Sequence, residues 1–153
     1  MDTGYPVILT DMEGISAVVV GGGPVGERKV KGLLAVGASV RLVSPEATRQ
    51  LQAMAAEGHI AWEQRPYEAG DLHGAQLAFA ATDHRTVNAQ VASDAAMLGL
   101  LCNVADAPDE GSFHLPAVHR EAGLVIAVST GGESPTRARQ VRDRIAAWLA
   151  EEA

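Results

Sequence analysis

The feature that most constrains this 153-residue chain is a glycine-rich turn directly after a short apolar run. Residues 15–20 form that run, and Gly21, Gly23 and Gly26 then fit the pattern G-x-G-x-x-G. Such glycines permit a tight turn, let a pyrophosphate approach the backbone, and let the following helix pack close to the strand. Pro24 suits the first turn of that helix. The turn predicts a dinucleotide-binding α/β fold; a plain turn with glycines for flexibility is the alternative.

Short apolar runs alternate with helical periods along the rest of the chain, which predicts a Rossmann-like parallel sheet flanked by helices. Strands are expected at residues 15–20, 39–43, 60–62, 76–81, 100–104 and 124–129, and an extended segment at 111–115. Helices are expected from Pro24 to before Gly37, at 46–57, at 84–98, and from Ser134 and Pro135 onward. The helix residues expected to face inward are Val30, Leu33, Leu34, Leu51, Met54, Val87, Val91, Ala95, Leu98, Val141, Ile145, Trp148 and Leu149.

The domain organisation follows from this order of elements. We expect residues 1–115 to form an NAD-binding Rossmann-like domain and residues 116–153 to form a separate strand–helix segment. A single strand and helix of this size cannot bury a core of their own. The C-terminal segment must therefore pack on the sheet or on another subunit.

Composition excludes several classes of protein. Nineteen acidic against twelve basic residues give a net charge of −7, which disfavours nonspecific binding to nucleic acid. No apolar run reaches the roughly 18 residues that span a bilayer, and the start Met1–Gly4 lacks the basic stretch of a signal peptide. The single cysteine, Cys102, excludes a disulfide framework and a cysteine-rich zinc site, and we expect it in the core. A cytoplasmic protein is expected.

An acidic residue follows the second predicted strand. Glu46 lies 20 residues after Gly26, where a carboxylate can bind the ribose hydroxyls of a dinucleotide. The first arginine after this strand is Arg49, so NAD is favoured over NADP.

The glycine turn also carries a family resemblance. Residues 21–29 read GGGPVGERK and resemble the GGGxVAxRK loop of the siroheme synthase N-terminal module, the precorrin-2 dehydrogenase/sirohydrochlorin ferrochelatase family. The resemblance continues in the family's order through residues 43–46, 65–67, 80–83, 103–108 and 129–135. The chain departs from the family at Gly26, at His84 and at Glu110–Gly111, and it stops where full modules continue into a helical domain.

The resemblance implies an NAD-dependent oxidation of precorrin-2 to sirohydrochlorin, with insertion of Fe²⁺ to give siroheme in many members. It also implies a homodimer formed through the C-terminal segment. It assigns the family's key acid to Asp106. The resemblance, the glycine motif and the residues after the fourth predicted strand together give the expected cofactor-binding residues. These are Gly21, Gly22, Gly23, Pro24, Val25, Pro45, Glu46, Thr82 and Asp83.

The residues themselves suggest roles at the carboxyl edge of the sheet, where ligands of open α/β sheets bind. Asp106, just beyond the fifth strand, can accept a proton from the macrocycle, or can simply cap the turn before Pro108. Asn103 can orient the substrate or the nicotinamide amide, or satisfy a turn. Asp83 can face the ligand or act as the N-cap of the next helix.

A second glycine loop precedes the last predicted helix. Thr130, Gly131 and Arg137 can hold carboxylates of the tetrapyrrole through backbone N–H groups and the guanidinium, or can form an ordinary solvated helix face. His114 is a further candidate for a substrate carboxylate or for metal delivery, and no resident metal site is expected. Two other functions stay open: a non-catalytic dinucleotide-sensing module, and a dehydrogenase with a separate chelatase.

Overall fold

The computed structural model describes residues 4–152, and this part of the chain forms two compact units. The larger unit comprises residues 7–113, and the smaller unit combines residues 4–6 with 114–152. The prediction about the start of the chain falls on Met1–Gly4, of which all but Gly4 lies outside the described residues. None of the described helices is long and apolar enough to span a membrane.

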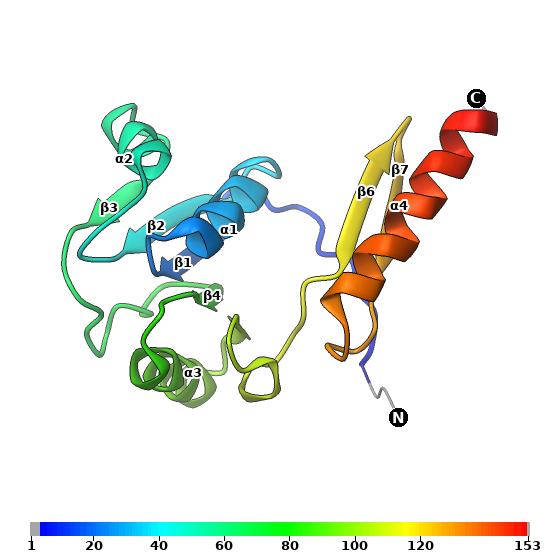
Figure 1. The fold of residues 1–153 in the computed structure, drawn as a ribbon. Helices are drawn as coiled ribbons and strands as arrows, with labels where there is room; N and C mark the ends of the chain where they lie inside the picture. The colour runs from blue at the N-terminus through cyan, green and yellow to red at the C-terminus, as the bar shows by residue number, and fades with distance from the viewer. Residues whose placement is uncertain (1–3, 153) are drawn as a thin grey trace. The chain divides into compact units, whose positions relative to one another are not determined.

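The larger unit is built on a five-stranded parallel sheet of order β3-β2-β1-β4-β5. Its strands are β1 (Ser16–Val20), β2 (Ser39–Val43), β3 (Ala61–Glu63), β4 (Leu77–Ala80) and β5 (Leu101–Val104). Helices α1 (Pro24–Leu34) and α2 (Arg49–Ala56) lie on one side of the sheet and α3 (Arg85–Leu98) on the other (Figure 1). The predicted Rossmann-like sheet is confirmed.

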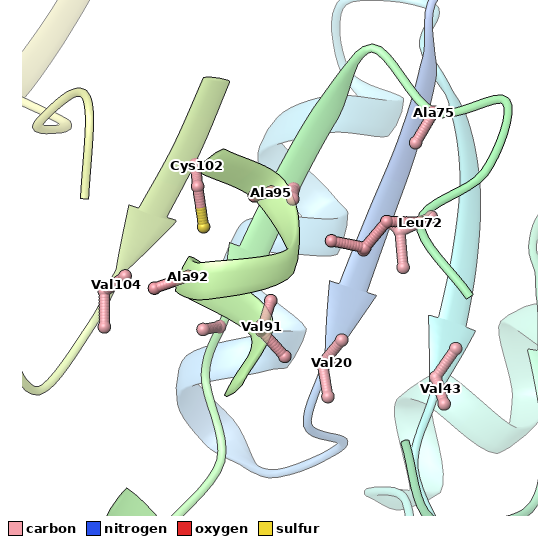
Figure 2. Close-up of a cluster of buried hydrophobic side chains, with 12 residues drawn as sticks. Val20, Val43, Leu72, Ala75, Val91, Ala92, Ala95, Cys102 and Val104 are labelled. Carbon is pink, nitrogen blue, oxygen red and sulfur yellow. The ribbon is translucent and has the colours of Figure 1, made fainter. Parts of the chain in front are cut away.

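Both faces of this sheet are covered, which explains why its strands appear in the sequence as almost uninterrupted apolar runs. Val19 and Leu42 pack with Val30 of α1 and Leu51 of α2. On the other face, side chains of α3 pack over β1 and β5, and Cys102 points toward this helix (Figure 2). Cys102 is buried as expected, and burial raises the pKa of its thiol to about 11.

A buried carboxylate holds the long connection between β3 and β4. Asp71 is only 6% exposed and accepts two hydrogen bonds from Arg65, Nη1 to Oδ2 at 2.9 Å and Nη2 to Oδ1 at 2.6 Å. The backbone N–H of Glu68 donates a third, at 2.8 Å. These bonds, those from Arg65 first, hold the pKa of Asp71 below its usual value. Tyr67 meanwhile donates to Asp94 of α3 at 2.7 Å, so the motif at residues 65–67 anchors this connection to that helix.

The segment after β5 runs back along that edge strand. A 3₁₀ turn, η1 (Pro108–Glu110), is followed by Gly111, whose missing Cβ would lie 2.7 Å from the carbonyl oxygen of Cys102. Ser112 then exchanges hydrogen bonds with Cys102, from N to the carbonyl oxygen and from the Cys102 N–H to Oγ, each at 2.8 Å. Residues 111–115 form no strand, but this close approach explains why glycine stands at position 111.

The smaller unit consists of an antiparallel hairpin and one helix. Strands β6 (Ala117–Glu121) and β7 (Leu124–Val128) pair with each other, and α4 (Pro135–Glu152) packs on them. The sequence did not predict β6. Ser134 caps α4 as expected, since its Oγ accepts from the N–H of Arg137 at 3.2 Å.

Several predicted details of the helices are wrong. Trp148 and Leu98 were expected to face inward, but their exposed fractions are 57% and 43%. The helix predicted at 46–57 begins at Arg49, because Thr48 is its N-cap and accepts from the N–H of Leu51 at 3.3 Å. Pro45 and Glu46 consequently lie in the turn that precedes α2.

Candidate functional site

Three of the four glycines in the turn between β1 and α1 pack directly against backbone. A Cβ on Gly21, which has a φ of 116°, would lie 2.3 Å from the carbonyl oxygen of Ala81. A Cβ on Gly22 would lie 2.2 Å from that of Glu46, and one on Gly26 would lie 1.9 Å from that of Gly21. Around Gly23, by contrast, no described atom lies within 4 Å of the Cβ position. The turn is therefore tightly packed at three points and open at one.

Hydrogen bonds fix this turn to the carboxyl end of β2. The N–H of Gly22 donates to Ser44 Oγ at 3.0 Å, and that hydroxyl donates to the carbonyl oxygen of Glu46 at 2.6 Å. The N–H of Thr48 donates to the carbonyl oxygen of Gly22 at 2.9 Å. Pro45 and Glu46 are thus held beside the glycine turn with exposed side chains, as the sequence predicted for the acid.

The first turn of α1 presents the backbone groups that bind anions. Pro24 and Val25 are its first two residues, and Gly23 is its N-cap, so no side chain occupies the N–H groups of this turn. The N-terminal end of the helix carries partial positive charge. Glu27 lies close by, but its carboxylate is bound by Lys31 at 2.5 Å and by the Thr48 hydroxyl at 2.6 Å. These bonds lower the pKa of Glu27, that from Lys31 most, and they offset its charge beside the helix end.

Thr82 and Asp83 follow β4 at the same edge of the sheet. The buried side chain of Asn88 organises this turn: its Oδ1 accepts from the Thr82 hydroxyl at 2.7 Å, and its Nδ2 donates to the Thr82 carbonyl at 3.0 Å. The hydroxyl of Thr82 is thus engaged within its own turn. The alternative role of Asp83 as an N-cap is wrong, because His84 is the N-cap of α3 and makes no side-chain capping bond. The side chain of Asp83 is exposed, and its Oδ1 lies 3.4 Å from Nε2 of His84.

Asn103 lies at the carboxyl end of β5. Its side chain is 6% exposed, and its Nδ2 donates to the carbonyl oxygen of Phe113 at 3.1 Å. Its Oδ1 is buried and has no hydrogen-bond partner among the described residues. A buried acceptor without a donor is costly, and such atoms commonly mark positions where a ligand or a water completes the bonding.

Asp106 follows β5 and does not cap its own turn. Its Oδ1 accepts from Nη1 of Arg85 at 2.6 Å, and the other terminal nitrogen of Arg85 donates to Glu110. The N–H of Ala105 donates to the carbonyl oxygen of Ala80 at 2.9 Å, which ties the start of this loop to the end of β4. Asp106 is therefore a half-exposed carboxylate: Arg85 holds its Oδ1, and its Oδ2 has no hydrogen-bond partner among the described residues.

The remaining predicted residues lie in the smaller unit. Thr130 Oγ1 accepts from the N–H of Ser134 at 2.9 Å, and the N–H of Gly131 donates to Ser129 Oγ at 3.1 Å. The ring of His114 lies 3.5 Å from the Cβ position of Gly132, so this histidine lies against the glycine loop. The guanidinium of Arg137 has no partner within residues 4–152.

The larger unit thus gathers its predicted residues at one edge of the sheet. Gly21, Glu46, Thr82 and Asp106 follow the carboxyl ends of β1, β2, β4 and β5, and Asn103 is the last but one residue of β5. In the smaller unit, His114, Thr130 and Gly131 lie together before α4.

Ser44 and Asn88 belong to the stretches that carry the family resemblance, but sequence reasoning gave no site role to them or to Arg85, and these three residues hold the site residues in place. Their positions offered a signal: each is a polar side chain that lies directly after a predicted strand or near the start of a predicted helix. Among residues 4–152, no group of three or more histidine, cysteine or acidic side chains is arranged to hold a metal ion.

Comparisons with known proteins agree with this geometry. Residues 8–117 match the model of a family described as "Putative NAD(P)-binding", and residues 123–147 match that of the "Sirohaem biosynthesis protein central" family. The chain is 41% identical over 145 residues to a siroheme synthase of Pseudomonas entomophila (strain L48). The chain belongs to the family described as "Putative NAD(P)-binding".

The extent of these matches differs between relatives. The alignment with the Pseudomonas entomophila protein covers 95% of this module and 31% of the relative, so the module spans about a third of that protein. A siroheme synthase of Methylococcus capsulatus (strain Bath) is 40% identical over 141 residues, which is 92% of the module and 30% of the relative. A solved structure named "SirC, precorrin-2 dehydrogenase" superposes with a TM-score of 0.82 at 28% identity, covering 94% of the module and 70% of that chain.

Proposed function

We propose that this module oxidises precorrin-2 to sirohydrochlorin with NAD⁺ as the hydride acceptor. The observation that carries the proposal is the glycine turn, which is packed against backbone at three glycines and open at Gly23, the N-cap of α1, which has no side chain to bond the first N–H groups of the helix. The names of the relatives, siroheme synthase and precorrin-2 dehydrogenase, supply the substrate class. The carboxylate of Asp106 at the same edge of the sheet supplies a proton acceptor.

The residues present fit a dinucleotide. The open position at Gly23 and the N–H groups of α1 would hold the pyrophosphate, and the exposed carboxylate of Glu46 would accept hydrogen bonds from the ribose hydroxyls. We propose NAD rather than NADP because a carboxylate at this position repels a 2′-phosphate. Backbone groups of Thr82 and Asp83 complete the proposed cofactor site.

In this proposal, NAD⁺ held by the turn at Gly23 and by Glu46 would supply the hydride acceptor when one C–H bond of the macrocycle breaks. Asp106 accepts the proton that leaves at the same time, so two electrons and two hydrogens depart from precorrin-2. Asn103 orients one of the two reacting rings, since its unpaired Oδ1 can accept from a carboxamide or pyrrole N–H. The chain's own contribution is position and proton transfer.

Precorrin-2 carries eight carboxylates, and we propose that the smaller unit binds some of them. Arg137 offers a guanidinium without a partner among the described residues, and His114 lies against the loop of Thr130 and Gly131. The backbone N–H of Gly131 is already bonded to Ser129, so Arg137 and His114 carry this part of the proposal.

We also propose that the smaller unit forms a homodimer. Leu124 and Val125 of β7 are 54% and 41% exposed, and Val141, Ile145 and Trp148 lie together on one face of α4. A two-stranded hairpin with this much exposed apolar surface is marginal alone, and a second copy would cover it. We place the module in the cytoplasm, where a free thiol such as Cys102 persists.

Anaerobic incubation with precorrin-2 and NAD⁺ tests the proposed reaction. We expect sirohydrochlorin and NADH to appear together in a one-to-one ratio. Tight binding of NAD⁺ without any turnover would contradict an enzyme and favour a dinucleotide-sensing module. Adding Fe²⁺ as a substrate after the oxidation tests whether the module also inserts the metal.

A further inference from the structure

Arg85 joins two carboxylates at the edge of the sheet where Asp106 lies. It is the first residue of α3, and each of its two terminal nitrogens serves a different partner. Nη1 donates to Oδ1 of Asp106 at 2.6 Å, while Nη2 donates to Oε2 of Glu110. The planar guanidinium presents its donors in a fixed fork, so holding one carboxylate fixes the direction in which the other is held.

The two carboxylates flank a single short loop. Asp106 lies just before the 3₁₀ turn Pro108–Glu110, and Glu110 ends it. The loop is anchored to the sheet on both sides, by Ala105 bonded to Ala80 of β4 and by Ser112 bonded to Cys102 of β5. Between these anchors, the side-chain hydrogen bonds of the described loop residues go to Arg85. The guanidinium is therefore what sets the direction of the Asp106 carboxylate within an otherwise half-exposed loop.

We infer that Arg85 is a positioning residue for Asp106: it holds Oδ1 and leaves Oδ2 to receive the proton, and Glu110 keeps the guanidinium from rotating away. This inference rests on the proposed function, because it assumes that Asp106 is the proton acceptor. It also gives a role to Glu110, a position at which the chain departs from the family it resembles. Proton transfer requires the acceptor within hydrogen-bond reach of the proton, so a carboxylate free to rotate transfers less often.

The role is tested by a double-mutant cycle between Arg85 and Asp106, measured by sirohydrochlorin formation with saturating NAD⁺. Arg85→Met removes both hydrogen bonds and keeps most of the side-chain length. We expect kcat to fall roughly 10- to 100-fold, the scale of a misplaced catalytic group, while the KM for NAD⁺ stays within about twofold. The melting temperature should hardly change, because half-exposed ion pairs add little stability.

In the Asp106→Asn background, the same Arg85→Met change should lower the residual rate by less than about twofold, since Arg85 acts only through Asp106. Arg85→Lys should recover part of the loss, because an ammonium can hold Asp106 without a fork. Glu110→Gln keeps an acceptor for Nη2 and should cost less than about threefold in kcat.

The outcomes separate this inference from the proposed function. If Asp106→Asn is inactive while Arg85→Met turns over at the parental rate, Arg85 does not position Asp106, and the proposed function stands. An equal loss in both backgrounds overturns the inference as well, because Arg85 would then contact the substrate directly. If the unaltered protein forms no sirohydrochlorin from precorrin-2, the proposed function fails and this role of Arg85 fails with it.

Discussion

Both units place a glycine-rich loop before a helix, yet the two loops differ in what their backbone groups do. In the larger unit, Gly23 is the N-cap of α1 and no side chain occupies the first N–H groups of the helix. In the smaller unit, Ser134 caps α4, and Thr130 accepts from the N–H of Ser134. The first loop is open to an anion, whereas the second satisfies most of its own donors.

The units also differ in how much they bury. The sheet of the larger unit has an apolar core on each face, but Ala138 is the only buried residue described in α4, and β7 has none. A glycine loop before a helix thus stands beside a buried core in the larger unit. In the smaller unit it stands beside a hairpin and a helix that leave much of their apolar surface exposed. We interpret the larger unit as the cofactor-binding part and the smaller one as the part that needs a second copy.

The largest expected effect separates two adjacent glycines of the first loop. Gly23→Val should lower the affinity for NAD⁺ by at least roughly 10²-fold without lowering the melting temperature, because its side chain enters open space where the pyrophosphate would lie. Gly22→Val is the matched control, since its Cβ would lie 2.2 Å from a backbone oxygen; it should cost at least about 3 kcal/mol of folding free energy. Calorimetric titration and thermal melts measure both. Parental NAD⁺ affinity in folded Gly23→Val protein would remove the basis of the cofactor site.

The next prediction concerns the exposed apolar surface that β7 and α4 form in the smaller unit. Sedimentation should find the parent protein dimeric at micromolar concentration. Val125→Asp, which puts a charge on the exposed face of β7, should weaken the dimer at least roughly 30-fold. Gln140→Glu on the exposed side of α4 adds the same charge and should leave the dimer intact. A parent protein that sediments as a stable monomer contradicts the proposed role of this unit.

A third prediction compares a buried ion pair of the larger unit with an exposed ion pair of the smaller unit. Asp71→Ala should cost about 2 kcal/mol at neutral pH, because it removes a buried carboxylate that binds Arg65 twice. Since the folded state lowers the pKa of Asp71, the stabilisation is present above the unfolded value of about 4 and is lost as the pH falls through the lower, folded value. Asp143→Ala, which removes an exposed pair with Arg142, should cost under about 0.5 kcal/mol. Urea titrations across a pH series compare the two, and equal costs would refute the argument.

The smallest expected effect lies in the second glycine loop. Arg137→Met should raise the KM for precorrin-2 by about three- to fivefold, the scale of one exposed ionic contact, without changing the KM for NAD⁺. Arg139→Met on the same helix is the control for charge. A change in the KM for NAD⁺ would show that the second loop is not confined to the substrate.

The sequence predicted the sheet of the larger unit because its central strands, β1 and β4, are buried along most of their length and appear as apolar runs. It did not predict β6, since Ala117–Glu121 reads AVHRE and becomes a strand only by pairing with β7. Trp148 has the helical spacing of a side chain that faces inward, but it is 57% exposed because the described residues of the single chain do not cover it.

The site was predicted in part. The positions of Glu46, Asn103 and Asp106 followed from the ends of their strands. The hydrogen bonds from Arg85 to Asp106 and Glu110 could not be predicted from the sequence. Arg85 is 21 positions from Asp106 and 25 from Glu110, and the three residues meet only because β4 and β5 pair in parallel. Spacing in the sequence carries no signal for such a contact.

The most direct test of the account is the turnover of Asp106→Asn. Asparagine keeps the size of the side chain and an acceptor for Arg85, but it cannot take a proton near neutral pH. We predict a folded protein that binds NAD⁺ with parental affinity and oxidises precorrin-2 at least roughly 10²-fold more slowly than the parent. If Asp106→Asn forms sirohydrochlorin at the parental rate, Asp106 is not the proton acceptor, and the proposed mechanism is wrong.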